Sequence, residues 1–285
     1  MLEEITAVKE IVKANAAAVY QDAAQPSIRV VGKSLAQCVS LFASPVGRMA
    51  EIFEKNIHLY LNKLEGLKEE DLVSPDTRIL VPILEKMRFT DEEKVADYYA
   101  EILATASRKE HAGKVLITFI EILNRLTADE IKILEYINSP SNRVEIPEPT
   151  EAEIAQHGLE KGTRIVVIAG SLPVMEIQRT VEGQTGYKVI EKNYNCLSEV
   201  VELSTSTNLD AYIDNMISLG LIERKPNFVF AIDKIYYHLE NSPRAIATKK
   251  LIETDQKIKT NFQHGRIDIT DLGKKLLSLC SRQKI

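Results

Sequence analysis

The sequence contains no tryptophan, and aromatic residues make up only 6% of its 285 positions. The hydrophobic core must therefore be built mainly from aliphatic side chains. Cysteine is scarce as well, since Cys38, Cys196 and Cys280 are the only three and lie far apart. Their spacing fits neither a metal site nor a disulfide framework, so reduced thiols are expected.

The N-terminus lacks the features of a secretory signal peptide, because Glu3 and Glu4 stand near its start and no continuous apolar core follows. No stretch approaches the roughly 20 apolar residues that a membrane-spanning helix needs. We therefore expect a cytoplasmic protein without a transmembrane segment. The apolar fraction of 45% and the charged fraction of 27% are typical of globular chains, and the length allows about two domains.

The first 24 residues carry an apolar stripe at helical spacing, formed by Leu2, Ile5, Val8, Val12, Ala16 and Val19. Such a stripe must be buried. We expect it to pack on the helical half of the chain or on a second copy, with self-association favoured. A position on a membrane surface is disfavoured because the polar face is acidic.

The first half of the chain is predicted to be a helical domain, residues 1–138. Thr90 with Glu93 and Thr127 with Glu130 have the spacing of capping boxes, and helical apolar patterns follow both. Beyond residue 138 the pattern changes to β-branched runs, "RIVVIAGSLPVM" and "GYKVIEKNY", bounded by glycines. These runs predict strands.

The second half, residues 139–285, resembles a winged-helix module. The stretch "NLDAYIDNMISLG" is typical of its last helix, with Gly220 as the helix stop, and "IDITDLGKKLLSLC" fits a returning strand and a closing helix. If 126–137 is the opening helix, about 70 residues separate the two, so we predict a strand-rich insertion at about 140–195. The expected class is α+β and predominantly helical.

Several motifs fail on their spacing, and we assign no catalytic, cofactor-binding or metal-ligating residue. Gly32, Lys33 and Ser34 match the end of a phosphate loop, but Ser27 stands where that loop needs glycine. A dinucleotide-binding fingerprint needs three glycines, and "VVIAGS" contains only one. The five histidines show no i, i+4 pairing, and acidic clusters such as "DEEK" are typical of helix starts.

Charge is distributed unevenly along the chain. Residues 244–285 contain ten Lys or Arg against four Asp or Glu, whereas the whole chain has a net charge of −5. The candidate nucleic-acid contacts are Lys249, Lys250, Arg266, Lys274 and Lys275. The expected recognition helix carries Asp210 and Asp214 and no basic residue, so any nucleic-acid binding should be weak, non-specific and sensitive to salt. This pattern favours a protein partner over base readout.

The chain resembles the abortive-infection alpha family of bacterial proteins. The matching stretches are "GKSLAQCVSLFASPVGRM", "VPILEKMRFTDEEKVADYYAEILATA", "FIEILNRLTADEIKIL", "NLDAYIDNMISLGLI" and "ITDLGKKLLSLC", which run from Gly32 to Cys280. The family also leads us to expect a His-Pro pair before the phenylalanine helix, where this chain has "VLITF". The resemblance implies an anti-phage role ending in dormancy or death of the host cell, and it brings no catalytic residues.

Three classes of function remain open on these residues. The chain could act in abortive infection by binding a phage or host protein, without catalysis. It could be a winged-helix DNA-binding regulator that uses the basic C-terminal region. It could also be an enzyme whose site is assembled from distant residues, which a polar cluster in one pocket would reveal.

Overall fold

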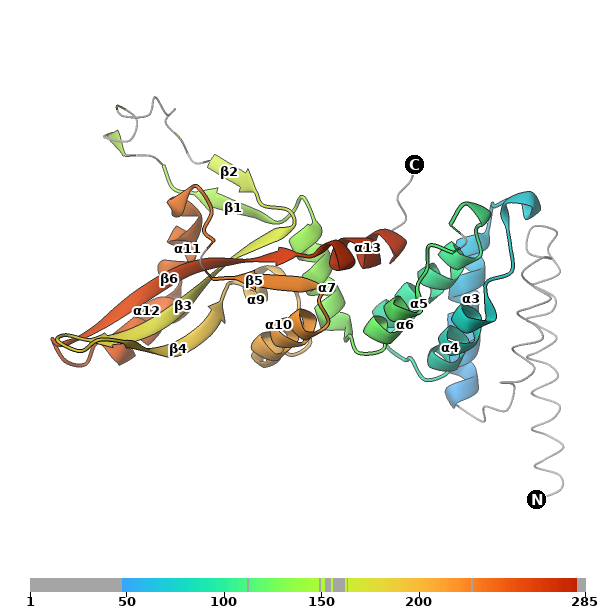
Figure 1. Ribbon diagram of the computed structural model, residues 1–285, viewed down its shortest axis with the longest axis horizontal. Helices are drawn as coiled ribbons and strands as arrows, with labels where there is room; N and C mark the ends of the chain where they lie inside the picture. The colour runs from blue at the N-terminus through green and yellow to red at the C-terminus, as the bar shows by residue number, and fades with distance from the viewer. Residues whose placement is uncertain are drawn as a thin grey trace, which may run out of the picture. The chain divides into compact units, whose positions relative to one another are not determined.

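The structure is a computed structural model that describes residues 48–111, 113–148, 150, 151, 155, 162, 164–226 and 228–280. In these ranges the chain forms ten α-helices and six β-strands, which confirms the α+β class (Figure 1). The chain divides into two compact units, the described residues up to Ala128 with those from Leu276, and residues 129–275. The stripe predicted in residues 1–24, the Gly-Lys-Ser motif and Cys38 lie outside the described residues.

The first unit is an assembly of helices around α5. Its elements are α3 (Arg48–Leu64), η1 (Glu69–Asp71), α4 (Thr77–Met87), α5 (Glu93–Ala106), η2 (Lys109–His111) and α6 (Ile117–Leu123). Every residue from Tyr98 to Ala106 is buried, as expected for a helix at the centre of its unit. Helix α3 runs in the same direction as α5, because Lys55 pairs with Glu93 and Lys63 with Asp97.

The start of α5 differs from the predicted capping box. The helix begins at Glu93, and its N-cap residue Glu92 makes no side-chain capping bond. The Thr90 hydroxyl instead donates to the Lys86 carbonyl at the end of α4 (2.9 Å), so the threonine closes the preceding helix. Buried Asn56 of α3 donates to the carbonyls of Met87 and Thr90, both at 2.8 Å, and fixes the same connection. This loop is thus ordered by a distant amide that local spacing could not reveal.

The second unit contains two antiparallel sheets and the remaining helices, of which α13 begins in this unit and ends in the first. Strands β1 (Arg143–Ile146) and β2 (Arg164–Val167) form one sheet. Strands β3 (Ser171–Val181), β4 (Tyr187–Tyr194), β5 (Ile222–Lys225) and β6 (Ile258–Ile269) form the other, in the order β4-β3-β6-β5. The helical elements are α7 (Ala128–Asn138), α9 (Leu197–Val200), η3 (Ser206–Asn208), α10 (Leu209–Ser218), η4 (Asp233–Tyr236), α11 (Tyr237–Glu240), α12 (Pro243–Ile252) and α13 (Asp271–Cys280).

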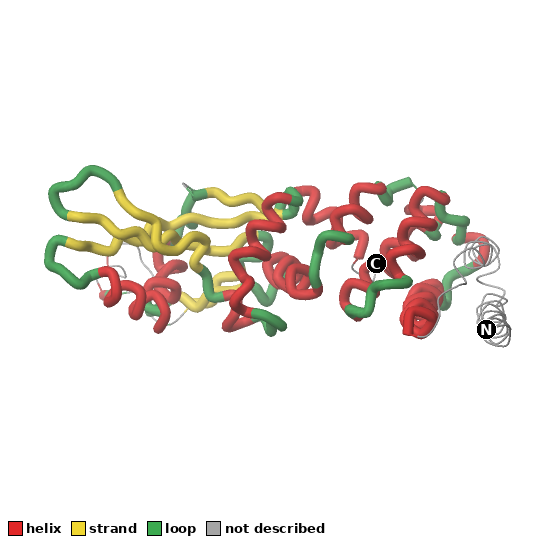
Figure 2. The backbone as a smooth tube through the Cα atoms, turned by 90° about the horizontal axis from the view of Figure 1, so that it is seen from below, coloured by secondary structure: helices red, strands yellow, loops and turns green. Residues whose placement is uncertain are grey.

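The strands expected between residues 163 and 192 are present, but β3 and β4 do not form a separate element. Strand β3 pairs with β6 over its full length, from Ser171 opposite Asp268 to Val181 opposite Ile258. It therefore lies inside the main sheet, which Figure 2 shows as the yellow group of strands. Met175 and Ile177 of β3 lie in one core cluster with side chains of α11 and α12. The pairing with β6 holds this apolar face of β3 in the core.

The end of α10, the strand β6 and the last helix α13 agree with the sequence prediction. Helix α10 ends at Ser218, and Gly220 takes the left-handed conformation with φ of 71° that a helix stop requires. The Thr270 hydroxyl accepts from the Gly273 N–H (3.1 Å) in the first turn of α13 and donates to the Gly220 carbonyl (2.6 Å). One threonine thus joins the start of α13 to the turn after α10.

Candidate functional site

Helix α10 presents an acidic surface. Leu209, Ile213 and Met216 are buried, whereas Asp210 and Asp214 are exposed as the periodicity predicts. No lysine or arginine lies on the helix. Phosphate oxygens carry negative charge, so this face repels a nucleic-acid backbone rather than attracting it.

A carboxylate clamp, formed by Asp129 of α7, holds the segment that leads into α10. The Asp129 carboxylate accepts from the backbone N–H groups of Ser204 (2.9 Å) and Thr205 (3.2 Å) and from the hydroxyl of Tyr212 (3.2 Å). Its neighbour Glu130 accepts from Asn215 (2.6 Å). Burial alone would raise the pKa of Asp129, but these backbone hydrogen bonds lower it below the ordinary value. Both acids therefore have a structural use in positioning α10.

The five basic candidates do not form one patch. Lys249 and Lys250 are exposed on α12, whose Ile252 packs near the start of β6, whereas Lys274 and Lys275 follow the end of β6 on α13. Twelve residues of β6 lie between the pairs, which in an extended strand span roughly 35 Å or more. A single phosphate group cannot contact both pairs.

Arg266, the fifth candidate, is already engaged. Its Nε lies 3.1 Å from the Asp268 carboxylate, and its guanidinium lies 6.0 Å from the centre of the Phe228 ring and 5.9 Å from that of Phe230. Asp268 also pairs with Lys225 at 3.0 Å. An incoming phosphate would have to replace contacts that the arginine already makes, so Arg266 is a poor anion site.

One cleft in the second unit brings a cysteine and a histidine together. It encloses about 230 Å³, and Cys196, Glu199 and His238 are among its lining residues. Burial and the neighbouring carboxylate of Glu199 raise the pKa of the Cys196 thiol to about 12. Burial also lowers the pKa of His238, so that side chain stays neutral. A reactive cysteine needs a lowered pKa, and this cleft produces the opposite effect.

The Cys196 thiol should therefore react slowly in the folded protein. In a Cys38→Ser/Cys280→Ser variant, we expect iodoacetamide to alkylate Cys196 at pH 8 about 10³-fold more slowly in the native state than in urea, because the thiolate fraction falls tenfold per pKa unit. Mass spectrometry of timed samples measures both rates. Equal rates in the two states would contradict the raised pKa.

A buried ion pair in the first unit joins Glu101 to Lys63. Glu101 is 2% exposed and accepts from Lys63 (2.9 Å), with Arg108 at 3.7 Å. Lys63 also contacts Asp97 at 2.6 Å. Burial would lower the pKa of Lys63, but the two carboxylates raise it, so the ammonium group stays charged. A lysine held in this state is a structural ion-pair partner rather than a nucleophile.

Within the described ranges, no cluster of three or more His, Cys, Asp or Glu side chains is arranged to hold a metal ion. Among the helices of the same ranges, none has both the length and the apolar character needed to cross a bilayer.

Comparison with known proteins identifies the family. The family described as abortive infection alpha matches residues 48–280, which is most of the chain. The chain belongs to the abortive infection alpha family. No curated protein matches it in sequence. A solved structure of an uncharacterized protein from the hydrocarbon-degrading marine bacterium Alcanivorax borkumensis SK2 is similar to part of this chain, with 14% sequence identity and a TM-score of 0.32. The matched region covers 61% of this chain and 97% of the other.

The stretch in which the abortive infection alpha resemblance predicts a His-Pro pair forms one wall of a surface groove. This groove of about 500 Å³ is lined by Val115 to Thr118 and by Asp76 and Arg78 at the start of α4. A hydrogen bond from Arg78 lowers the pKa of Asp76 to about 2, and the same carboxylate caps α4 by accepting from the Arg78 N–H (2.8 Å). The acid and the base thus satisfy each other, and the rest of the lining is mostly apolar.

A second surface that the sequence analysis missed follows β5 in this abortive infection alpha chain. Phe228 is 61% exposed, and Val229 and Ile232 are also exposed. In the stretch "FVFAI" only Phe230 is partly buried, packed against the core, while the two residues on either side of it are exposed. Clustered exposed apolar side chains of this kind mark contact surfaces more often than catalytic sites.

Proposed function

We propose that this chain is a non-enzymatic abortive-infection protein that acts in the cytoplasm by binding a phage or host protein. The family membership supports the biological role. The observation that carries the binding role is the apolar segment 228–232, which leaves Phe228, Val229 and Ile232 in solvent. Aromatic and aliphatic side chains of this kind become the anchors of protein interfaces when a partner excludes water from them.

The order of elements supports a winged-helix-like module behind this surface. Helices α7, α9 and α10 and strands β3, β5 and β6 follow one another in the order of a winged helix, and β6 pairs between β3 and β5. In this interpretation residues 226–257 are the wing. The part of this wing that follows β5 presents Phe228, Val229 and Ile232 to solvent, whereas four of the wing's five basic residues lie further along, from Arg244 onward. The segment directly after β5 therefore fits a protein partner.

A phage-challenge assay tests this proposal. The parent chain, expressed in a phage-susceptible bacterium, should lower plaque formation by at least one phage of a panel. Phe228→Ser/Ile232→Ser should abolish that protection, because loss of central interface anchors typically weakens binding by about 30-fold or more. Protection is measured as the plating efficiency relative to an empty vector.

The matched control is Phe89→Ser, which removes a phenylalanine of similar exposure, 59%, from the first unit. It should leave protection unchanged, and both variants should keep the parent's melting temperature. A parent chain that protects against no phage would contradict the role in defence. Full protection by Phe228→Ser/Ile232→Ser would contradict the role of the wing.

A further inference from the structure

One end of the four-stranded sheet is basic. It consists of residues 179–192 and 244–259, which contain eight Lys or Arg and four Asp or Glu. The β3–β4 turn and the turn before β6 meet there, since Glu182 N–H donates to the Lys257 carbonyl (2.7 Å). Figure 2 shows both turns as green loops at the same end of the strands. We call this region the basic end.

Three of the four acids of the basic end already accept hydrogen bonds, and Asp255 does so from the Lys257 N–H (2.9 Å). Glu191 accepts from Arg244 (2.6 Å) and Thr248 (2.8 Å), which ties α12 to β4. Glu253 accepts from the Thr260 N–H at 2.9 Å. In contrast, the basic side chains of Arg179, Lys188, Lys250 and Lys257 make no ion pair with any residue that the structure describes. The region therefore offers unneutralised positive charge.

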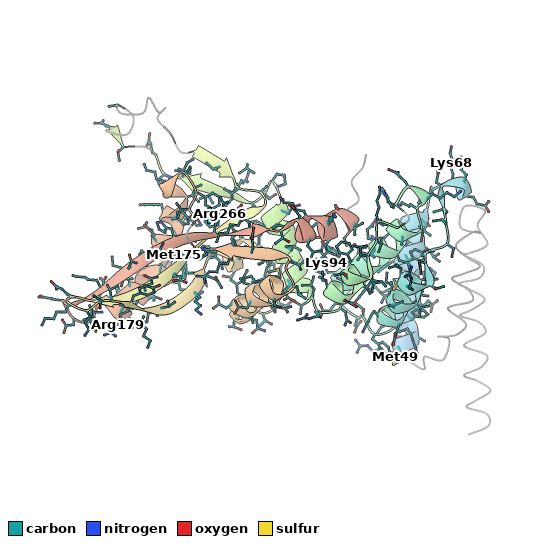
Figure 3. All side chains as sticks on the ribbon, viewed as in Figure 1. Met49, Lys68, Lys94, Met175, Arg179 and Arg266 are labelled. Carbon is teal, nitrogen blue, oxygen red and sulfur yellow. The ribbon has the colours of Figure 1, made fainter. Side chains whose placement is uncertain are left out.

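Arg179 and Lys188 stand directly opposite each other on neighbouring strands. Directly opposed like charges destabilise a sheet, and an anion placed between them would remove that cost. Figure 3 shows Arg179 near the end of the sheet, away from Arg266. Arg179 also lines a groove of about 530 Å³ between the sheet and α12, together with the apolar side chains of Ile190, Leu251 and Ile258. The groove thus combines an anion contact with an apolar wall.

Large apolar side chains project from the same region into solvent. Leu251 is 79% exposed and Tyr187 is 62% exposed. Tyr187 is paired with Thr180, one position from the Arg179–Lys188 pair, so it lies on the opposite face of the sheet. A peptide bound in the groove would contact only the α12 face. A planar surface with an anionic outer layer and an apolar interior can contact Tyr187, Leu251 and the basic side chains of this end together.

We propose that the basic end docks on a membrane surface made of anionic phospholipids. Arg179 and Lys188 bind a lipid phosphate, Lys250 and Lys257 add attraction to the charged headgroups, and Leu251 and Tyr187 enter the interfacial layer. A nucleic acid would use the same positive charge, but it offers no aliphatic medium for Leu251. Residues 244–257 of the basic end belong to the proposed wing, but the proposal does not use the apolar segment 228–232, on which the proposed function rests.

Vesicle sedimentation with the full chain tests this proposal. The protein should pellet with vesicles of phosphatidylcholine and phosphatidylglycerol in equal parts and stay in solution with phosphatidylcholine alone. Lys250→Gln/Lys257→Gln should lower the partition coefficient by about fivefold for each charge removed. Leu251→Gln should lower it by roughly tenfold, because one buried apolar side chain is lost. Both variants change exposed residues, so their melting temperatures should equal that of the parent.

The matched control is Lys274→Gln/Lys275→Gln, which removes the same charge beyond the other end of β6 and should leave the partition coefficient unchanged. An equal loss in this control would overturn the assignment to the basic end. Absence of binding to the anionic vesicles, or full binding by Leu251→Gln, would overturn the proposal as well. If a random DNA duplex binds through Lys250 and Lys257 while vesicles do not bind, the surface is a nucleic-acid site instead.

Discussion

Gly273→Ala is expected to destabilise the second unit by about 3 kcal/mol or more. A Cβ atom at residue 273 would lie 2.3 Å from the Leu221 carbonyl oxygen and 2.9 Å from a methyl carbon of Ile269. The carbonyl cannot move away freely, because it accepts from both the N–H and the hydroxyl of Thr270, at 3.0 and 3.1 Å. Alanine favours a helix over glycine by only about 1 kcal/mol, so the clash decides the sign.

Urea unfolding followed by circular dichroism measures this effect through the midpoint of the transition. Lys274→Ala is the control on the same helix, since Lys274 is exposed and its loss should change the free energy of unfolding by less than about 0.5 kcal/mol. A Gly273→Ala protein as stable as the parent would show that α13 can shift away from the turn after α10.

Asp129→Ala is expected to lower the free energy of unfolding by about 2 to 3 kcal/mol, because the N–H groups of Ser204 and Thr205 lose a charged acceptor. Asp129→Asn should cost less than Asp129→Ala, since its amide oxygen can still accept these N–H groups but no longer carries a charge. Asp214→Ala is the control, because it removes an exposed acid from α10 itself. A control that loses as much stability as Asp129→Ala would refute the clamp.

The pH dependence gives the same prediction a second measurement. The pKa of Asp129 is lowered in the folded protein, so its stabilisation is fully present above its ordinary pKa of about 3.9 and is lost as the pH falls through the folded value. The difference in unfolding free energy between the parent and Asp129→Asn should be constant near neutral pH and shrink below about pH 4. A difference that grows on acidification would contradict the direction of the shift.

The features that the sequence predicted correctly are those that depend on neighbouring residues. Gly220 stops α10 because only the local backbone decides its left-handed conformation. The strands between 163 and 192 follow from β-branched runs between glycines. Helix α12 also has a local signal, although it was not predicted. Ser242 caps it by accepting from the Ala245 N–H, and Pro243 follows. Serine before proline is a frequent helix start.

The features that the sequence could not predict depend on distant partners. Thr90 has the spacing of a capping residue, yet Asn56, 34 positions away, holds the carbonyl of that threonine. The basic residues were grouped from their closeness in sequence, whereas the extended strand β6 separates Lys250 from Lys274 in space. The position of Arg179 in the basic end could not be predicted, because it depends on Lys188 across the hairpin and on α12.

The pairing of β3 with β6 sets the order of events during synthesis on the ribosome. Paired residues of these strands are separated by 77 to 97 positions in the chain. At a translation rate of roughly 5 to 20 residues per second, β3 waits about 4 to 19 seconds for its partner. During that time Met175 and Ile177 lack the cover that α11 and α12 later provide. The nascent chain thus exposes an apolar strand with an open edge, which makes this interval the one in which a chaperone has most to protect.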